Sequence, residues 1–269
     1  MNRTKKGSAL EVISENTVHF VGAGPGDPEL ITVKGQRLLQ EADVVIYTGS
    51  LVPKPLVTGL KANVYDSAGL HLDEVFALIL QSWKNGAKVV RLHTGDSSIF
   101  GAINEQIALL EEHDIPFKVI PGVSSALATA AALATQLTLP EVSQTVIFTR
   151  RAGRTPVPEK EDLISLASHQ ATMMIFLSVG MIEKVVDDLL AGGYPENTPI
   201  AIVEKASWPD ERQIRGTLAT ITKQVHEAHI NKTAMIAVGK VLADAPPPAL
   251  SKLYDKNFSH EFRQGTKTV

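Results

Sequence analysis

Residues 18–28 read VHFVGAGPGDP, a short apolar run that ends in three closely spaced glycines. The apolar part, 18–21, is typical of a strand that is buried on both faces. The glycines and Pro25 then let the backbone turn sharply and approach another group closely, because glycine has no Cβ. This stretch therefore predicts a buried strand followed by a tight turn into a helix.

The same pattern recurs along the chain. Between the strands lie apolar helical stripes, the clearest at 72–83 with Gly86 suited to end it. Strands that alternate with helices favour an α/β fold with a mostly parallel sheet and helices on both faces. The expected strands are 18–21, 44–47, 89–92 and 117–120, then 145–148, 172–177, 200–204 and 234–238, with helices near 159–168, 181–191 and 217–229 in the second series.

We expect two α/β domains. The predicted limits are an N-terminal tail at 1–15, an N-terminal domain at 16–139, a C-terminal domain at 140–244 and a C-terminal tail at 245–269. The first tail lacks periodicity and the second opens on three prolines before it turns polar, so both are expected to be poorly ordered.

The composition excludes several classes of function. The 269 residues contain no cysteine, so a disulfide framework, a thiolate metal site and a cysteine nucleophile are excluded. A net charge of −3 and 5% aromatic residues argue against a nucleic-acid partner. Neither a secretory signal nor an apolar run of about 18 residues is present, so we expect a cytoplasmic protein with no membrane partner.

The glycine turn differs from a dinucleotide-binding loop at one position. Asp27 stands where the third glycine of that fingerprint belongs, and its carboxylate would repel a pyrophosphate. The chain also lacks the phosphate-binding loop of nucleoside triphosphatases. A tight turn that binds no ligand stays an alternative.

Two further loops follow predicted strands. In 95–101, Asp96 is either a ligand-binding residue or the N-cap of a helix at 102–112. In 121–125, Ser124 or Ser125 either contacts a ligand or caps the next helix, while the absence of a G-x-S-x-G elbow disfavours a serine hydrolase. Ligands of open α/β sheets bind beyond the carboxyl ends of the strands, so the three loops are expected to share one crevice.

Three arginines within five residues indicate an anion-binding loop at 149–158. Arg150, Arg151 and Arg154 make a carboxylate clamp plausible, because guanidinium groups bind carboxylates with two parallel hydrogen bonds; a solvated basic loop is the alternative. His226 and His229 share a helical face but have no third ligand nearby, so no metal site is expected.

Taken together, these segments resemble the tetrapyrrole (corrin/porphyrin) methylase family. Its motifs G-x-G-P-G-D-x-x-L-[IL]-T, G-D-x-x-x-[FY]-G and P-G-[VI]-[ST]-[SA] are matched in order at 22–32, 95–101 and 121–125, and the resemblance extends from about 18 to 243. Segments 67–74, 153–159 and 205–211 are similar to the subgroup that methylates C-11 of precorrin-4, with or without cobalt, in cobalamin biosynthesis. Thr48 stands where uroporphyrinogen III methylases carry an aspartate, and the lysine that they place before 67–69 is missing, which disfavours that earlier step.

The resemblance implies a homodimer that binds S-adenosyl-L-methionine in a cleft between the two α/β domains and releases S-adenosyl-L-homocysteine as a product. The acetate and propionate groups of a tetrapyrrole substrate then point first to Arg150, Arg151 and Arg154, with Lys205, His71 and Arg91 behind them. His71, Glu74 or water stay open for any removal of a proton, and no catalytic residue is assigned. The positions carried over as cofactor contacts are Pro25, Thr94, Gly95, Asp96, Ile99, Ser124, Ser125, Ser178, Ala206 and Ala234.

Other functions stay open at this point. A methylase of the same fold can act on another corrin position, on ribosomal RNA or on a modified histidine of an elongation factor. A protein of another class can sense a nucleotide-like ligand without chemistry.

Overall fold

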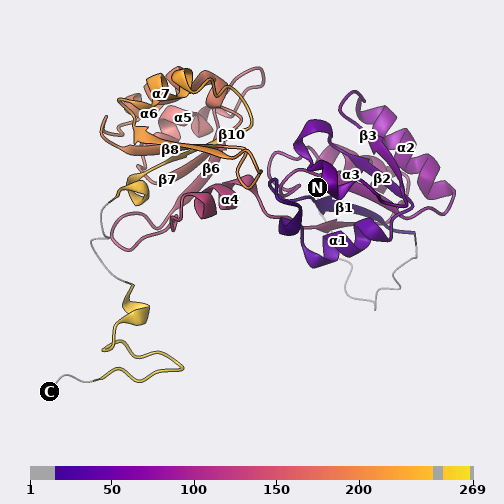
Figure 1. Ribbon diagram of the computed structural model, residues 1–269, viewed down its shortest axis with the longest axis horizontal. Helices are drawn as coiled ribbons and strands as arrows, with labels where there is room; N and C mark the ends of the chain where they lie inside the picture. The colour runs from indigo at the N-terminus through magenta and orange to yellow at the C-terminus, as the bar shows by residue number, and fades with distance from the viewer. Residues whose placement is uncertain (1–15, 245–250, 267–269) are drawn as a thin grey trace. The chain divides into compact units, whose positions relative to one another are not determined.

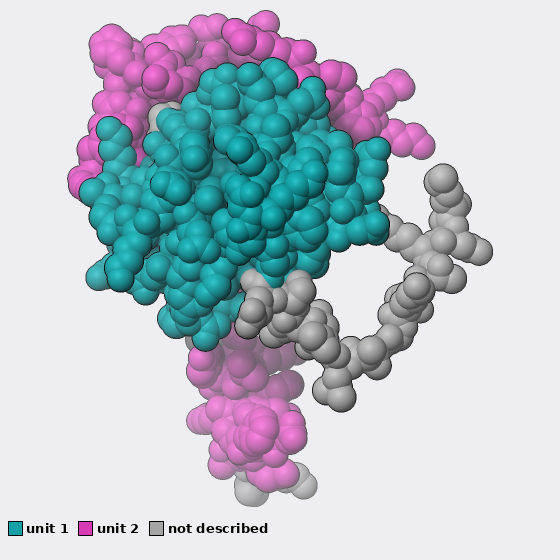
Figure 2. All heavy atoms as spheres, turned by 90° about the vertical axis from the view of Figure 1, so that its right-hand side faces the viewer, with its two compact units in different colours: residues 1–124 teal, residues 125–269 magenta. Residues whose placement is uncertain are grey.

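The computed structural model describes residues 16–244 and 251–266 (Figure 1). The chain divides into two compact units, 1–124 and 125–269, which Figure 2 distinguishes by colour. Each unit is built on its own five-stranded sheet. Among these described residues, no helix has both the length and the apolar character that crossing a membrane requires.

The first sheet is entirely parallel. Its strand order is β3-β2-β4-β1-β5, and every neighbouring pair runs in the same direction. Parallel strands place all their carboxyl ends at one edge, and the connections between them must cross a face of the sheet. The strands are β1 (Val18–Gly22), β2 (Val44–Tyr47), β3 (Asn63–Asp66), β4 (Val89–His93) and β5 (Phe117–Ile120).

Helices cover both faces of this sheet. On one face, Val45 and Leu92 pack with Leu39 of α1 (Val33–Gln40). The same core includes Val52, which follows the short helix η2 (Gly49–Leu51), and Leu56 of η3 (Lys54–Leu56). On the other, Ile46 packs with Ile79 of α2 (Leu72–Lys84) and with α3 (Asn104–Glu112). The apolar runs are buried on both faces because alternate residues enter different cores. The predicted α/β class of this unit is confirmed.

The second sheet is mixed. Its order is β6-β7-β10-β8-β9; β6 and β7 are parallel, whereas β10 runs antiparallel to both β7 and β8. The strands β6, β7 and β8 therefore end at one edge of the sheet, and β10 begins at that same edge. The strands are β6 (Val146–Arg150), β7 (Thr172–Phe176), β8 (Pro199–Glu204), β9 (Arg212–Thr217) and β10 (Ala234–Val238).

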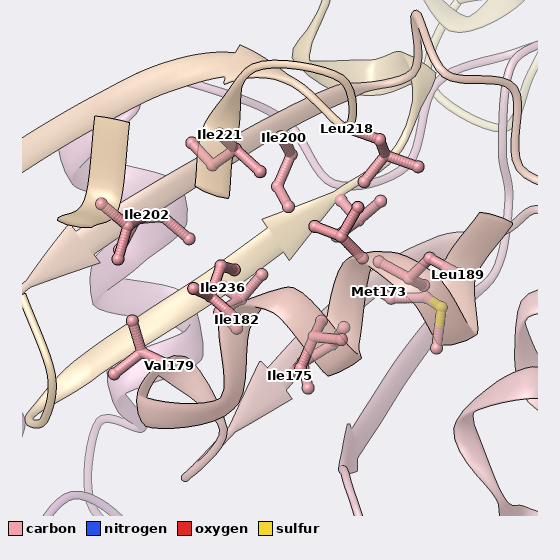
Figure 3. Packing of buried hydrophobic residues seen from close by; sticks show 14 of the residues in the cluster. Met173, Ile175, Val179, Ile182, Leu189, Ile200, Ile202, Leu218, Ile221 and Ile236 are labelled. Atoms are coloured by element: carbon pink, nitrogen blue, oxygen red, sulfur yellow. The ribbon is translucent and has the colours of Figure 1, made fainter. Parts of the chain in front are cut away.

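A single apolar core underlies one face of the second sheet (Figure 3). Met173, Ile202 and Ile236 from three strands pack with Leu189 of α6 and Ile221 of α7, all of them buried. Removing one such side chain to alanine typically costs about 2–5 kcal/mol. The remaining elements are η1 (Pro28–Leu30), α4 (Ser125–Ala132), η4 (Glu159–Glu161), α5 (Leu163–Ala167), η5 (Val179–Met181), α6 (Ile182–Ala191), α7 (Ile221–Glu227), η6 (Lys240–Leu242) and η7 (Lys252–Tyr254).

Two strands have no counterpart in the sequence prediction. All four residues of β3 are exposed, and every residue of β9 is exposed or half-buried, so neither edge strand has a buried apolar run. β9 extends to Thr217 and α7 begins only at Ile221, so the helix predicted near 217–229 is shorter than expected.

The two units divide at Ser124–Ser125, whereas the sequence places the boundary at 139–140. Helix α4 belongs with the second unit because it contacts β10 and because β9 binds its end. There Gln213 Nε2 donates to Ala132 O at 3.0 Å and Arg215 Nη2 donates to Leu133 O at 2.6 Å.

Of the tails expected to be poorly ordered, 1–15, 245–250 and 267–269 lie outside the described residues. Within 251–266 the structure has η7 and a bridge between His260 and Arg263.

Candidate functional site

Three loops meet at the carboxyl edge of the first sheet. Gly24 and Gly95 form an isolated bridge, with N–O distances of 3.2 and 2.8 Å in the two directions. A Cβ added to Gly122 would lie 2.1 Å from Gly95 O, and one added to Gly22 would lie 2.6 Å from the same oxygen. The backbones after β1, β4 and β5 are therefore in direct contact, at distances that only glycine permits.

The turn after β1 is stabilised by its own side chains. Pro25 is buried within it. Asp27 Oδ1 accepts the N–H of Glu29 at 2.9 Å and caps η1, while Thr32 Oγ1 accepts the N–H of Gly35 at 3.1 Å and caps α1. The aspartate and threonine of the first motif thus start two helices, in agreement with their type.

Asp96 joins two of the three loops. Its Oδ1 accepts the N–H of Ser98 at 2.8 Å, and its Oδ2 accepts the N–H of Gly122 at 2.8 Å. Burial acts to raise the pKa of Asp96, but the hydrogen bonds from Ser98 and Gly122 outweigh it and hold that pKa below its ordinary value. Asp96 is thus ionised at neutral pH. The alternative that it caps the helix after this loop is wrong, because α3 begins at Asn104 with Ile103 as its N-cap.

Four polar atoms at this edge are buried without a hydrogen-bond partner among the described residues. They are Thr48 Oγ1, His93 Nε2, Thr94 Oγ1 and Ser97 Oγ. Burial, and after it the charge of Arg91, lowers the pKa of His93 to about 3, so its ring is neutral. An unpaired buried polar group costs roughly 1–3 kcal/mol. The edge therefore has hydrogen-bonding capacity that suits a polar ligand.

The loop after β3 leads into α2 and places His71 at the N-cap and Glu74 in the first turn of that helix. Glu74 Oε2 accepts the N–H of His71 at 3.0 Å, which satisfies one backbone donor at the start of α2. The His71 ring lies 3.6 Å from Glu74 Oε2 and 3.8 Å from Asp73 Oδ2, and the side chains of His71 and Glu74 are 66% and 49% exposed. Both residues thus cap the start of α2, and their side chains remain accessible to a ligand.

In the second unit, Ser178 links the ends of β6 and β7. Its hydroxyl accepts the N–H of Arg151 at 2.9 Å and donates to Phe176 O at 2.7 Å, and the side chain is fully buried. At the same edge, the N–H of Lys205 donates to Thr233 O at 2.8 Å, which joins the loop after β8 to the start of β10. The topology thus gathers Ser178, Ala206, Ala234 and the arginine loop at one edge of the sheet.

The three arginines of this edge have different surroundings. Arg150 Nη2 donates to Pro156 O at 2.7 Å and closes its own loop. Arg151 Nε lies 2.6 Å from Asp188 Oδ2 on α6, and both side chains are largely buried. Arg154 is exposed and has no ion-pair partner in the part of the chain that the structure describes. Arg154 therefore has the guanidinium that is most available to a ligand.

Several residues of this edge have a backbone conformation that side chains disfavour. Leu177, Lys205 and Ser207 have φ values of 54°, 50° and 68°. Such residues cost of the order of 1–3 kcal/mol each and occur preferentially at functional sites. The Lys205 ammonium is paired with Asp210, and this hydrogen bond holds the pKa of Asp210 below its ordinary value.

Comparison with known proteins agrees with this geometry. The sequence profile of the tetrapyrrole (corrin/porphyrin) methylases matches residues 17–222. The chain belongs to this family. One tetrapyrrole methylase relative, the cobalt-precorrin-4 C(11)-methyltransferase of Methanocaldococcus jannaschii, is 56% identical over 252 residues, which are 93% of this chain and 97% of the relative. The precorrin-4 C(11)-methyltransferase of Pseudomonas aeruginosa is 48% identical over 250 residues, which are 93% and 99% of the two chains.

Solved structures of tetrapyrrole methylases have the same fold. The X-ray structure of a cobalt precorrin-4 methyltransferase matches with a TM-score of 0.83 and 44% identity, and covers 85% of this chain and 97% of its own. The uroporphyrin-III C-methyltransferase of Thermus thermophilus, complexed with S-adenosyl homocysteine, matches with a TM-score of 0.72 and 30% identity, over 84% and 98% of the two chains.

Two residues near these edges were missed by the sequence prediction for a tetrapyrrole methylase. Leu177 is an apolar side chain that is 72% exposed beside the buried Ser178. Gln106 is buried on α3 and contacts the loop that carries Asp96. No pattern in the sequence marks either residue, because apolar exposure at a strand end and polar burial on a helix depend on the tertiary structure.

Proposed function

We propose that the chain transfers a methyl group from S-adenosyl-L-methionine to C-11 of precorrin-4, or of its cobalt complex, in cobalamin biosynthesis. The support comes from relatives that carry this name and align along nearly their full length. The structural observation that carries the proposal is the contact between Gly22, Gly95 and Gly122 at an edge with polar atoms that have no partner among the described residues.

The proposed cofactor contacts in the first unit are Pro25, Thr94, Gly95, Asp96, Ile99 and Ser124. The glycine backbones permit close approach, and the Thr94 hydroxyl has an unpaired oxygen to offer. Asp96 is ionised and contributes a negative charge that complements a cationic donor.

In the second unit we assign Ser125, Ser178, Ala206 and Ala234 to the cofactor. The Ser178 hydroxyl already accepts one hydrogen bond and donates another within the protein, so its role is to shape the edge. Leu177, exposed and held at φ 54°, adds an apolar surface beside it that suits the flat face of a heterocycle.

Carboxylate side chains of the tetrapyrrole are proposed to bind Arg150, Arg151, Arg154 and Lys205. Arg154 is the leading residue because it is exposed and has no ion-pair partner within the described ranges, whereas Arg150 and Arg151 stabilise the loop that presents it. Arg91 is 5% exposed within the core of the first unit and is not part of this proposal.

Bound S-adenosylmethionine supplies an activated methyl group on a sulfonium. The protein then needs chiefly to align the ring carbon with that methyl and to exclude water, and such alignment accounts for about 7–11 kcal/mol of barrier lowering. An edge built of glycine backbones and buried hydroxyls fits this task, because it allows a ligand to approach the backbone closely and offers it hydrogen bonds. His71 and Glu74, whose side chains are accessible, are proposed as groups that can accept a proton from the methylated carbon.

We further propose that the protein is a homodimer located in the cytoplasm and has no nucleic-acid partner. The net charge of −3 supports the last point, because nucleic-acid binding usually requires a basic surface. Sedimentation equilibrium of the purified protein tests the dimer, and a monomeric mass contradicts it.

The deciding experiment incubates the protein with methyl-labelled S-adenosylmethionine and with precorrin-4, once with cobalt in the macrocycle and once without. We expect one labelled methyl at C-11, identified by mass spectrometry and NMR, together with release of S-adenosylhomocysteine. The preferred form of the substrate is the one with the higher kcat/KM.

Two results contradict the proposal in different ways. A label at another ring carbon identifies a methylase of the same family with a different substrate. Binding of S-adenosylmethionine without any release of S-adenosylhomocysteine identifies a sensor.

A further inference from the structure

The loop at 94–103, between β4 and α3, has an unfavourable backbone conformation. Phe100 and Ala102 have φ values of 52° and 47°. Between them, Gly101 lies so close to Ser97 that an added Cβ would be 2.1 Å from the Ser97 carbonyl oxygen. Non-glycine residues in this conformation cost of the order of 1–3 kcal/mol each and persist only where their surroundings hold them.

Asp96 holds the first half of the loop. Its carboxylate binds Ser98 and Gly122, and its carbonyl oxygen accepts the N–H of Ile99 at 3.2 Å. These contacts end at Ile99. The left-handed Ala102 comes after that point, so these contacts of Asp96 do not reach it.

A buried chain of hydrogen bonds reaches the second half. Gln106 Nε2 donates to Ala102 O at 3.1 Å, and Gln106 Oε1 accepts from Arg91 Nε at 3.0 Å. Arg91 Nη1 donates in turn to Ile46 O at 3.1 Å. Gln106 is 7% exposed and Arg91 is 5% exposed. The left-handed Ala102 is thereby tied to two central strands of the sheet, β4 and β2.

Arg91 is suited to hold Gln106 in a fixed orientation. Burial lowers the pKa of Arg91 to about 10, so the guanidinium is still charged at neutral pH. No carboxylate pairs with it among residues 16–244 and 251–266, and the Gln106 amide oxygen is its side-chain acceptor. Hydrogen bonds from a charged donor are shorter and about twice as strong as neutral ones. Arg91 therefore fixes the position of the amide oxygen of Gln106, which directs the amide nitrogen toward the carbonyl oxygen of Ala102.

We propose that Arg91 and Gln106 are positioning residues that hold the loop at 94–103 in its cofactor-binding conformation. The inference rests on the proposed assignment of the cofactor to Thr94, Gly95, Asp96 and Ile99. Arg91 and Gln106 are buried and act on the cofactor site only through the backbone of Ala102.

The test is Gln106→Glu, which keeps an acceptor for Arg91 and removes the donor to Ala102. In the ligand-free protein, we expect faster hydrogen–deuterium exchange of the backbone amides at 97–103, by roughly tenfold. The Kd for S-adenosylhomocysteine, measured by calorimetry, rises by about the same factor. KM for S-adenosylmethionine rises while kcat and the melting temperature stay near those of the wild type, because the introduced carboxylate forms an ion pair with Arg91.

Gln170→Glu is the matched control. It removes another amide-to-carbonyl hydrogen bond, from Gln170 Nε2 to Gly193 O at 2.9 Å, in the second unit. This variant is expected to leave exchange at 97–103 and the Kd unchanged. An equal effect of both substitutions overturns the inference.

Ala102→Gly gives a second, independent test, because glycine adopts a positive φ without strain. In the Ala102→Gly background, Gln106→Glu is expected to raise the Kd by less than in the wild type. An equal rise in both backgrounds overturns the inference. Unchanged exchange at 97–103 in Gln106→Glu overturns it as well, whatever the ligand does.

Asp96→Ala separates this inference from the proposed cofactor site. If Asp96→Ala leaves the Kd unchanged, the proposed cofactor assignment fails, while the exchange experiment still decides whether Gln106 restrains the loop. If Asp96→Ala weakens binding and Gln106→Glu does not, only the positioning role fails.

Discussion

Gly122→Ala tests the contact between the loops of the first unit. The added Cβ would lie 2.1 Å from Gly95 O and 2.8 Å from Gly22 Cα. An ordinary carbon contact needs more than 3 Å, so the loop must move by roughly 1 Å. That movement breaks the 2.8 Å hydrogen bond from the N–H of Gly122 to Asp96 Oδ2. Overpacking and the lost charged hydrogen bond together should destabilise the protein by about 2–4 kcal/mol.

Urea unfolding gives the change in the free energy of unfolding for this variant, and calorimetry with S-adenosylhomocysteine gives the change in affinity. We expect the affinity to fall by at least tenfold, because Asp96 loses its link to the neighbouring loop. Gly69→Ala is the control for folding, since an added Cβ there meets nothing within 4 Å. Wild-type stability and affinity in Gly122→Ala would refute the contact between Gly122 and Gly95 as the basis of the site.

Three further predictions concern the second unit and the effect of pH. Arg154→Ala should raise KM for the tetrapyrrole about tenfold and leave KM for S-adenosylmethionine unchanged, because it removes the exposed guanidinium that we propose as a partner of a substrate carboxylate. Unaltered steady-state kinetics would contradict this proposed role. Asp188→Asn should lower the free energy of unfolding, measured in urea, by roughly 1–3 kcal/mol and should weaken tetrapyrrole binding, because Arg151 loses its largely buried counter-charge. The substitution Asp187→Asn at the exposed neighbouring position should have neither effect. The pKa of His93 is about 3 in the folded protein against an ordinary value of 6.5, so between these two pH values the unfolded chain binds a proton that the folded protein does not. The free energy of unfolding should therefore fall by up to about 1.4 kcal/mol per pH unit as the pH drops below 6.5. His93→Gln should remove this part of the pH dependence, and an identical slope in both proteins would show that His93 is not buried.

The strands that the sequence predicted are those with buried apolar runs. Segments such as 44–47 and 89–92 appear in the structure within one residue of the expected limits, because burial on both faces demands continuous β-branched residues. The edge strands β3 and β9 were missed for the opposite reason, since their mostly exposed side chains need no apolar pattern. The position of α4 was missed because its attachment to the second unit depends on Gln213 and Arg215, about 80 residues further along the chain.

The candidate site was predictable where it consists of backbone. Glycine at Gly22, Gly95 and Gly122 indicates that another group approaches the backbone closely at each position. The strand order then makes these positions neighbours, because β1 lies between β4 and β5. Side-chain roles were harder to predict. The three arginines of one loop look equivalent in sequence. In the structure, however, Arg151 is paired with Asp188 and Arg150 donates to backbone carbonyls of its own loop, which leaves Arg154 as the available guanidinium.

The reversed direction of β10 has a consequence for how such a site can change. A segment that follows a strand at this edge leads on to the next element of the chain. The segment before Ala234 instead arrives from α7 and enters the sheet at the rim where β6, β7 and β8 leave it. Residues inserted just ahead of β10 would enlarge this rim without altering any strand, so the shape of the rim can change through an incoming as well as through an outgoing segment.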